Sequence, residues 1–541
     1  MRRAAYLFEA KSIQAHLRAG GRLRDAVGAS AVIDAISGDA TSTNPGRGTS
    51  LLDGLLGTLA RQGDVHVVRR AAGAFRLVFS GDEAAACADH MRRLTRLALP
   101  SVAPGLDFVD AVGEGDDAAA ALKDAQEASL GRRGLSPRFE PPVAPIAERA
   151  PRTGTAAAGT VRDKAEPGRT EPADAALLSK RRMAGATTLL ARFVERERAI
   201  AADWPYKIED LFTGGDGARI VGVLHADGNR LGSVVRAMSD RLECEAGKSD
   251  GSLSPSERRW IDAHAGFSRA IAEATRKACI RATTTVVVPE RKTGGLYPMR
   301  PLVQAGDDVT VLLRGDLALP YAEVFLTAFE EFSAALLEEL FGKFGLGAPP
   351  PLSACAGIAL VGEGQPFADA HDLAEDLCGF AKERAKATCG AQDRVPSALA
   401  FHRVAASLVR PWGDIERDDL STSGGILTLG PYGCPRPGET SPLPRLDALR
   451  DLADVVRRES FRRGPLRELA TLLYDAPSEA GRKWARIRKI MAKEAPDDLA
   501  AFETRLSALT GEPVGAGIVT TKGYSPLADL LAIAAVEGRT N

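Results

Sequence analysis

Cysteine is scarce and irregularly placed in this sequence. The 541 residues include seven cysteines, and no two of them have the C-x-x-C spacing of a zinc-ligand pair. An odd number of scattered cysteines argues against a disulfide framework and indicates a reducing compartment. We therefore expect a cytoplasmic protein that carries neither structural disulfides nor structural zinc.

Long apolar runs and an excess of charge of one sign are also missing. No stretch of about 18 consecutive apolar residues occurs, so the sequence predicts no transmembrane helix. The first residues are interrupted by Glu9 and Lys11, which does not fit a secretory signal peptide. The formal net charge of −1 argues against strong autonomous binding of nucleic acid. Local basic patches, such as the one at residues 482–489, stay candidates for contact with RNA or with another subunit.

What the sequence does contain is an acidic tetrapeptide between two apolar runs. The sequence Ala-Gly-Asp-Asp at residues 305–308 separates residues 301–304 from residues 309–313, which predicts a strand, a tight turn and a second strand. Adjacent carboxylates repel each other, and a divalent metal ion between them would relieve that repulsion. Gly and Asp are also common in turns without any catalytic role, so the surrounding elements have to decide between these interpretations.

A third acid ends a strand further upstream. Residues 219–226 predict an apolar strand, and Asp227 follows in an Asp-Gly-Asn turn. An acid at a strand end beside an acid pair on a hairpin forms a palm, in which nucleotidyl polymerases and cyclases hold two metal ions. We therefore expect Asp227, Asp307 and Asp308 to be catalytic and to bind two Mg²⁺ or Mn²⁺ ions. Gly306 would let the backbone pass close to a nucleotide.

The order of the predicted elements supports a palm. After the first strand come, in order, a helix at 256–281, a strand at 282–288, the acidic hairpin, a helix at 321–344, a strand at 352–361 and a helix from about 367. This order predicts an α+β fold, a ferredoxin-like palm with helices on one face of an antiparallel sheet.

Residues 219–403 resemble the active palm of the large polymerase/cyclase subunit of type III CRISPR effector complexes. The similarity rests on motifs that occur together, at residues 227–232, 305–308, 353–359, 366–367, 381–386 and 397–402. The family has glycine where this chain has Ala305. Many members also carry an HD nuclease domain and zinc-ligating cysteines, and we expect neither in this protein.

The resemblance implies a nucleotidyltransferase that links ATP into a cyclic oligoadenylate messenger when an RNA-guided complex meets target RNA. Lys382 and Lys386 lie one helical turn apart and could hold the phosphates of ATP. The implied partners are guide-RNA-binding repeat subunits, small helical subunits, guide RNA and target RNA, with no membrane. Two alternatives stay open: a catalytically silent scaffold subunit, which Ala305 slightly favours, and a stand-alone nucleotide cyclase.

The N-terminal part resembles the first palm of the same family. The resemblance lies in residues 6–14 and 20–36. Residues 72–75 read Ala-Gly-Ala-Phe where the second hairpin reads Ala-Gly-Asp-Asp, which predicts a duplicated palm whose first copy binds no metal.

Three residues of the first palm are singled out by this comparison. Glu9 is the one acid that could take the place of Asp227 in the first copy. The resemblance implies that the first palm holds an acceptor nucleotide, and Gly28 and Ser30 could line its pocket.

The chain has room for three or four domains of about 150 residues. The predicted division is a first palm at 1–130, a flexible linker rich in Pro, Ala and Gly at 131–176, a helical connector at 177–212, a second palm at 213–405 and a mainly helical C-terminal domain at 406–541.

Overall fold

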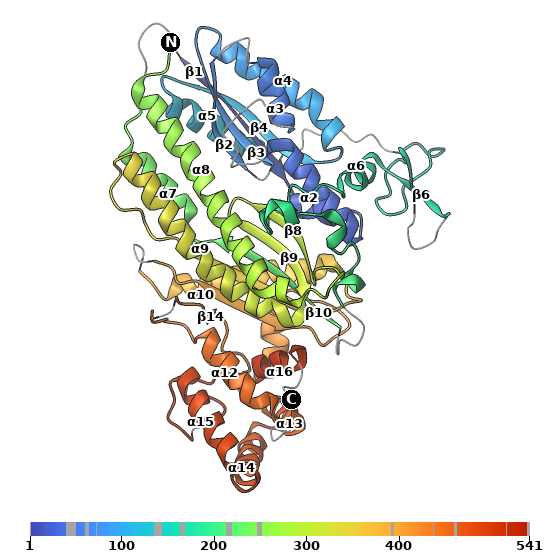
Figure 1. Cartoon of the computed structure of the whole chain (residues 1–541), viewed down its shortest axis with the longest axis vertical. Helices are drawn as coiled ribbons and strands as arrows, with labels where there is room; N and C mark the ends of the chain where they lie inside the picture. The colour runs from blue at the N-terminus through green and yellow to red at the C-terminus, as the bar shows by residue number, and fades with distance from the viewer. Residues whose placement is uncertain are drawn as a thin grey trace.

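The computed structural model describes most of the chain. The described residues are 2–38, 50–59, 64–71, 73–134, 143–162, 168–212, 219–245, 252–390, 394–436, 438–458, 463–515 and 517–537. Two sheets follow one another along the long axis of the molecule, and a group of helices forms its C-terminal end (Figure 1). We refer to the two sheets with their helices as the first palm and the second palm.

The two sheets share one strand order. The first palm has the order β2-β3-β1-β4, with β1 at Arg3–Lys11, β2 at Asp64–Ala71, β3 at Ala74–Ser80 and β4 at Asp107–Gly115. The second has the order β14-β11-β10-β7-β9-β8, with β7 at Ile220–Gly228, β8 at Met299–Ala305, β9 at Asp308–Arg314, β10 at Ala354–Gly362, β11 at Ala398–Arg403 and β14 at Tyr432–Gly433. Strands β8-β9-β7-β10 therefore repeat β2-β3-β1-β4. The prediction was an antiparallel sheet. Strand β11 pairs parallel to β10, so the second sheet is mixed.

The registers of the strands allow single residues of the first palm to be aligned with those of the second. The two hairpins close with the pairs Ala71–Ala74 and Ala305–Asp308, and the register of both ladders shifts at the same distance from the turn. Asp308 thus corresponds to Ala74, and Asp307 to Gly73. The sequence comparison paired residues 72–75 with residues 305–308, and this pairing is wrong by one residue. Ala72, which it included, lies outside the described residues.

The first strands of the palms align in the same way. Phe8 lies opposite Phe75, and Ala226 lies opposite Val309, so Glu9 takes the place of Asp227. The sequence predicted this correspondence.

A residue with positive φ follows Glu9 and Asp227 by three positions in the two palms. Ser12 and Arg230 have φ values of 52° and 56°, and they are the non-glycine residues with positive φ among the described residues. Each precedes a helix, α1 at Ile13–Arg18 or α7 at Leu231–Arg241. A left-handed residue is costly for a side chain with a Cβ, so its repetition supports a common architecture for the two palms.

Helices cover both faces of each sheet, and the prediction of helices on one face is wrong. In the first palm α2 (Leu23–Ser37), α3 (Leu51–Leu59) and α4 (Ala84–Val102) lie on one face and α5 (Ala118–Arg132) on the other; in the second palm α8 (Pro255–Ala282) and α9 (Gly315–Lys343) lie opposite α10 (Phe367–Ala387). The physical reason is that both faces of the central strands are apolar. Along β1, Tyr6 belongs to the core beneath α4, whereas Leu7 belongs to the core beneath α5.

The predicted strand at residues 282–288 is also wrong. Helix α8 continues into a π-helical turn at Thr283–Val287 and a short 3₁₀ turn at Val288–Glu290. Thr283 and Val287 are buried, and the turn packs against α9. This packing outweighs the β propensity of the Thr and Val residues, which is weak and depends on context.

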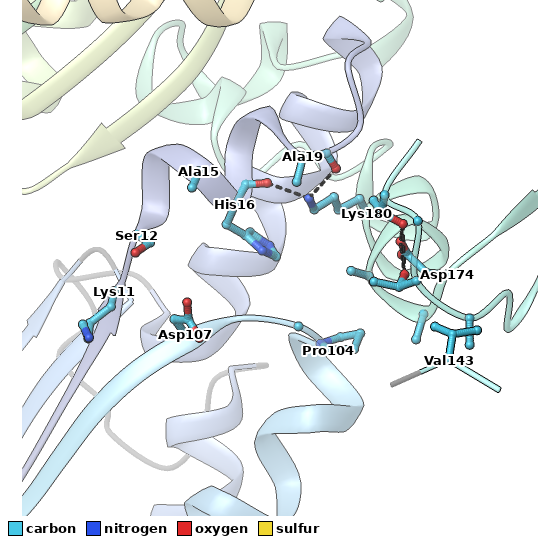
Figure 2. Close-up of a pocket in the computed structure, with 17 residues that line it drawn as sticks. Lys11, Ser12, Ala15, His16, Ala19, Pro104, Asp107, Val143, Asp174 and Lys180 are labelled. Atoms are coloured by element: carbon cyan, nitrogen blue, oxygen red, sulfur yellow. Dashed lines mark hydrogen bonds between the residues drawn. The ribbon is translucent and has the colours of Figure 1, made fainter. Parts of the chain in front are cut away.

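Part of the predicted flexible linker is folded. Strands β5 (Gly159–Arg162) and β6 (Thr170–Ala173) form a hairpin, and α6 (Ala175–Met183) follows. The Lys180 ammonium donates to the carbonyls of His16 and Ala19 at the end of α1, beside a cavity of about 750 Å³ (Figure 2). These contacts tie α6 to the first palm. The predicted helical connector at 177–212 continues as short 3₁₀ turns within residues 190–211.

The C-terminal part is mainly helical, as predicted. After α11 (Trp412–Ile415), β12 (Ser421–Thr422) and β13 (Gly425–Ile426), it contains α12 (Leu446–Arg457), α13 (Arg463–Asp475), α14 (Pro477–Glu494), α15 (Pro496–Thr510) and α16 (Leu527–Val536). Among the described residues, none of the helices combines the length and the apolar character needed to cross a bilayer.

Candidate active site

The structure brings the three predicted acids together. Asp227 lies near the end of β7, Asp307 is in the hairpin turn, and Asp308 begins β9. One carboxylate oxygen of each lies within 4.8 Å of those of the other two, and all three side chains are half-buried. This arrangement is the acid cluster that the sequence predicts for the second palm.

The hairpin turn requires glycine at one position only. Gly306 has a φ of 70°, a conformation that strongly favours glycine. Ala305 is the last residue of β8, pairs with Asp308 and is not among the residues with positive φ. Alanine is therefore compatible with the backbone here, and the departure from the family's glycine gives no reason to expect a distorted turn.

Close packing around Gly228 holds Asp307 against the end of β7. A Cβ atom on Gly228 would lie 2.8 Å from Asp307 Oδ2 and 2.3 Å from Leu231 Cδ1. Asn229, the next residue, donates from Nδ2 to Ser353 Oγ at 2.9 Å, and its backbone N–H donates to the Ser353 carbonyl at 2.8 Å. The Asp-Gly-Asn turn is thus fixed on both sides of the glycine.

Gly228→Ala is expected to displace Asp307 and lower catalytic activity by at least about tenfold, since sub-ångström changes in a catalytic group are costly. Gly379→Ala on α10 is the matched control, because a Cβ there meets no atom within 4 Å. Activity and circular dichroism spectra are measured for both variants, so that a local effect on the site can be separated from unfolding. Equal activity of the two variants would contradict the close approach.

Lys382 binds the acid cluster directly. Its ammonium donates to Asp227 Oδ2 and, at 3.0 Å, to the Gly228 carbonyl. Lys386 lies one turn further along α10 and is exposed. The structure thus brings one of the two predicted phosphate-binding lysines to the acids, and the phosphate-binding role of both stays a prediction.

The three acids differ in their affinity for a proton. Burial, followed by the charge of Asp227, raises the pKa of Asp307 to about 7. Burial and the charges of Asp227 and Asp307 also raise the pKa of Asp308. Burial opposes ionisation of Asp227 as well, but the Lys382 ammonium and hydrogen bonds outweigh it and lower the pKa of Asp227. Without a metal ion, the cluster therefore retains part of its protons near neutral pH.

The cluster fits divalent cations. Carboxylate oxygens are the preferred ligands of Mg²⁺ and Mn²⁺. Lys382 pairs with Asp227, and the charge of Asp227 adds to burial in raising the pKa of Asp307 and Asp308. Asp227, Asp307 and Asp308 would be the residues that hold the ions.

A basic pocket lies between the two palms and reaches the hairpin. It has a volume of about 390 Å³, and Gly306 and Asp307 form part of its wall. Four basic side chains line it, Arg69 on β2, Arg76 on β3, Lys123 on α5 and Arg236 on α7. Three of these come from the first palm, so the pocket exists only because the palms face each other.

Helix α8 contributes aromatic side chains to the wall of the pocket. Trp260 and His264 on α8 have ring centroids 4.0 Å apart, and His264 Nε2 lies 3.1 Å from Ser239 Oγ. Burial lowers the pKa of His264 to about 4, with a further contribution from Arg76. Burial and the nearby Arg69 lower the pKa of Arg76 to about 10, which leaves it charged at neutral pH. The pocket therefore combines fixed positive charge with a neutral aromatic surface.

The sequence did not identify this pocket, because its residues are separated by up to about 240 positions and share no motif. Gly28 and Ser30, which the sequence proposed for an acceptor pocket, lie in α2. Gly28 faces the backbone of Lys180, and neither residue lines the basic pocket. Their acceptor role stays a prediction.

Fold and site together define a protein with two palms, in which the acid cluster of one palm lies beside a basic pocket completed by the other. No protein-family model and no curated protein matches the sequence. The chain is similar to the crystal structure of a Csm1–Csm4 cassette in complex with AMPPNP, with a TM-score of 0.50 and 16% identity over 99% of this chain and 70% of that chain.

Two further solved structures are similar. A Csm1–Csm4 cassette in complex with cA3 has a TM-score of 0.49 and 15% identity over 99% of this chain and 70% of that one. Csm1 of T. onnurineus has a TM-score of 0.47 and 16% identity over 100% and 70%. The AMPPNP complex shows that this chain shares the fold of Csm1 of type III CRISPR complexes, so the resemblance seen in the sequence is confirmed at the level of the fold.

Proposed function

We propose that this chain is a metal-dependent nucleotidyltransferase that forms a cyclic oligoadenylate from ATP, as a subunit of an RNA-guided type III CRISPR complex activated by target RNA. The observation that carries the proposal is the acid cluster Asp227, Asp307 and Asp308 at the edge of the basic pocket between the palms. The shared fold with Csm1, solved in one case with AMPPNP, is consistent with it.

The charges of the site suit a triphosphate. Phosphate oxygens need cationic partners, which Arg76 and Arg236 offer from opposite palms. Helix α7 also begins at the pocket, where Leu231 and Gly232 line the wall, and its N-terminal N–H groups favour an anion. The aromatic wall at Trp260 and His264 offers a surface against which a base can stack.

The acids supply the other half of the chemistry. When bound, two Mg²⁺ or Mn²⁺ ions would activate a 3′-hydroxyl and neutralise charge on the α-phosphoryl group as pyrophosphate leaves. Lys382 neutralises Asp227 and stays close enough to the site to contact a phosphate. Lys386 would extend this positive surface by one helical turn, and Gly28 and Ser30 would belong to the acceptor side.

Arg76→Gln is expected to raise the KM for ATP by about ten- to a hundredfold with a smaller effect on kcat, since a charged hydrogen bond to substrate is lost. Arg93→Gln is the control, because Arg93 is exposed on α4 of the same palm and lies outside the pocket. The measurement is the rate of pyrophosphate release at varied ATP with Mn²⁺. An unchanged KM in Arg76→Gln would contradict binding of ATP in this pocket.

Identification of the reaction product separates the alternatives. The protein is incubated with labelled ATP and Mn²⁺, alone and with the products of neighbouring genes plus guide and target RNA, and the products are identified by mass spectrometry. Cyclic oligoadenylate that depends on target RNA supports the proposal. Product from the protein alone indicates a stand-alone cyclase. Complex formation without product indicates a silent scaffold.

A further inference from the structure

A second cluster of potential metal ligands lies on α10, apart from the three acids. His371, Asp372 and Glu375 each place a ligand atom within 4.8 Å of the others. His371 is 1% exposed, whereas both acids are exposed. His371 and Glu375 are four residues apart and therefore share one face of the helix.

The imidazole of His371 lacks a protein partner. Neither of its ring nitrogens has a hydrogen-bond partner although both are buried. Its neighbours include the rings of His225 and Phe367, each with a centroid 5.8 Å away. A buried polar atom without a partner is costly, and such atoms in folded proteins call for a ligand, a water molecule or an ion.

The chemistry of the three side chains suits a metal ion. An imidazole nitrogen that makes no hydrogen bond within the protein can offer its lone pair to a metal ion. A neutral imidazole with two carboxylates is a ligand set for Zn²⁺ or Mn²⁺ rather than for Mg²⁺, which prefers oxygen ligands alone.

An arginine of the first palm pairs with one acid of this cluster. Arg18 forms an ion pair with Asp372 across the two palms. Arg18 is six residues beyond Ser12, as Arg236 is six beyond Arg230, so the two arginines occupy corresponding places in the duplicated palms. Helix α10 likewise corresponds to α5 by its place in the strand order.

The two corresponding places carry opposite charge. Arg236 and the basic residue Lys123 of α5 both line the pocket between the palms, which suits an anion. Arg18 instead pairs with Asp372 of α10, and Glu375 places a carboxylate oxygen within 4.8 Å of a ligand atom of Asp372. A single arginine faces two acids and an unpartnered imidazole, so this side is suited to a cation.

We propose that His371, Asp372 and Glu375 bind one divalent transition-metal ion of the zinc class, and that this ion displaces Arg18 from Asp372. The site shares no residue with the acid cluster, and binding of the ion does not require the proposed catalytic activity. Because Arg18 belongs to the first palm and α10 to the second, binding of the ion would exchange an ion pair between the palms for a metal centre within one of them.

The test measures Zn²⁺ binding to the full-length protein carrying Asp307→Asn and Asp308→Asn, so that the acid cluster is weakened. Affinity is obtained by competition with a chromophoric chelator at pH 7. Glu375→Gln and Asp372→Asn, both at exposed positions, are each expected to weaken binding by at least about tenfold. Glu383→Gln, an exposed acid on the same helix, is expected to have no effect.

Arg18→Gln gives the sharpest distinction, because it removes the competing cation and should tighten Zn²⁺ binding by about three- to tenfold. A purely structural role of Arg18 would not predict tighter binding. Zinc X-ray absorption should show nitrogen and oxygen ligands near 2.0–2.2 Å, and sulfur at about 2.3 Å would assign the ion to cysteines instead. Absent binding, or binding unchanged by Glu375→Gln and Asp372→Asn, would overturn the proposal.

Discussion

Replacing Asp307 and Asp308 together by asparagine is expected to lower the rate of nucleotide transfer by at least about a thousandfold, because a neutral amide holds the cations that neutralise the transferring phosphoryl group far more weakly than a carboxylate does. The rate is measured as pyrophosphate release at saturating ATP and Mn²⁺. The side chains keep their size, and both residues are only half-buried, so the fold should persist.

The same double variant should make the metal-free protein more stable at high pH. Burial raises the pKa of both acids in the folded state, so each favours folding when protonated. This contribution is complete below the unfolded pKa near 4 and is lost as the pH rises toward the folded pKa, which for Asp307 is about 7. Through Asp307, wild type should therefore lose stability between about pH 4 and pH 7, whereas the double variant should not show this loss.

The expected difference in melting temperature is on the order of 2–5 °C at pH 8 and smaller at pH 5. Excess Mn²⁺ should stabilise wild type and have little effect on the double variant. Glu338→Gln with Glu339→Gln is the matched control, since these adjacent acids are exposed on α9. A double variant that keeps wild-type activity would show that the cluster is not catalytic.

Local patterns were sufficient to predict the acid cluster. Asp227 follows an apolar strand, and Asp307 and Asp308 occupy a glycine-containing turn between two others, so their meeting follows from the pairing of neighbouring strands. The long helices were predicted for the same reason, because a 3.6-residue apolar period over many turns has few alternatives.

Features that depend on packing between distant segments could not be predicted. The β-branched residues at 283–287 look like a strand and become helical only because α9 covers them. The basic pocket assembles Arg69, Arg76, Lys123 and Arg236 from separate elements, and no spacing in the sequence links them. Likewise, the pattern of Lys382 and Lys386 indicates a shared helix face but not that Lys382 contacts Asp227.

The hairpin at 159–173 was missed for a different reason. Its strands have four residues each, and few of their side chains are buried. Such short strands have no clear alternation of apolar and polar residues, and a composition rich in Ala, Pro and Gly resembles that of a linker. The packing of α6 on the first palm, through Lys180 and the close approach at Gly28, fixes this segment instead.

The two palms can be compared directly at one pair of corresponding positions. Asp227 of the second palm lies in the acid cluster, where its carboxylate receives the Lys382 ammonium. Glu9 of the first palm has no acid pair beside it, because Gly73 and Ala74 stand where the second palm has Asp307 and Asp308. Glu9 instead accepts hydrogen bonds from Arg133 at 3.3 and 3.4 Å.

Asp227→Asn is therefore expected to lower the rate of nucleotide transfer by about a hundred- to ten-thousandfold, whereas Glu9→Gln should stay within about threefold of wild type. Both changes remove one negative charge and keep the size of the side chain, so they differ only in the palm that they affect. Pyrophosphate release at varied Mn²⁺ should show that Asp227→Asn needs a higher Mn²⁺ concentration for half-maximal activity, whereas the concentration that Glu9→Gln needs is unchanged. A similar loss in both variants would mean that the first palm also binds a catalytic cation, since an exposed Glu–Arg pair alone cannot account for such an effect.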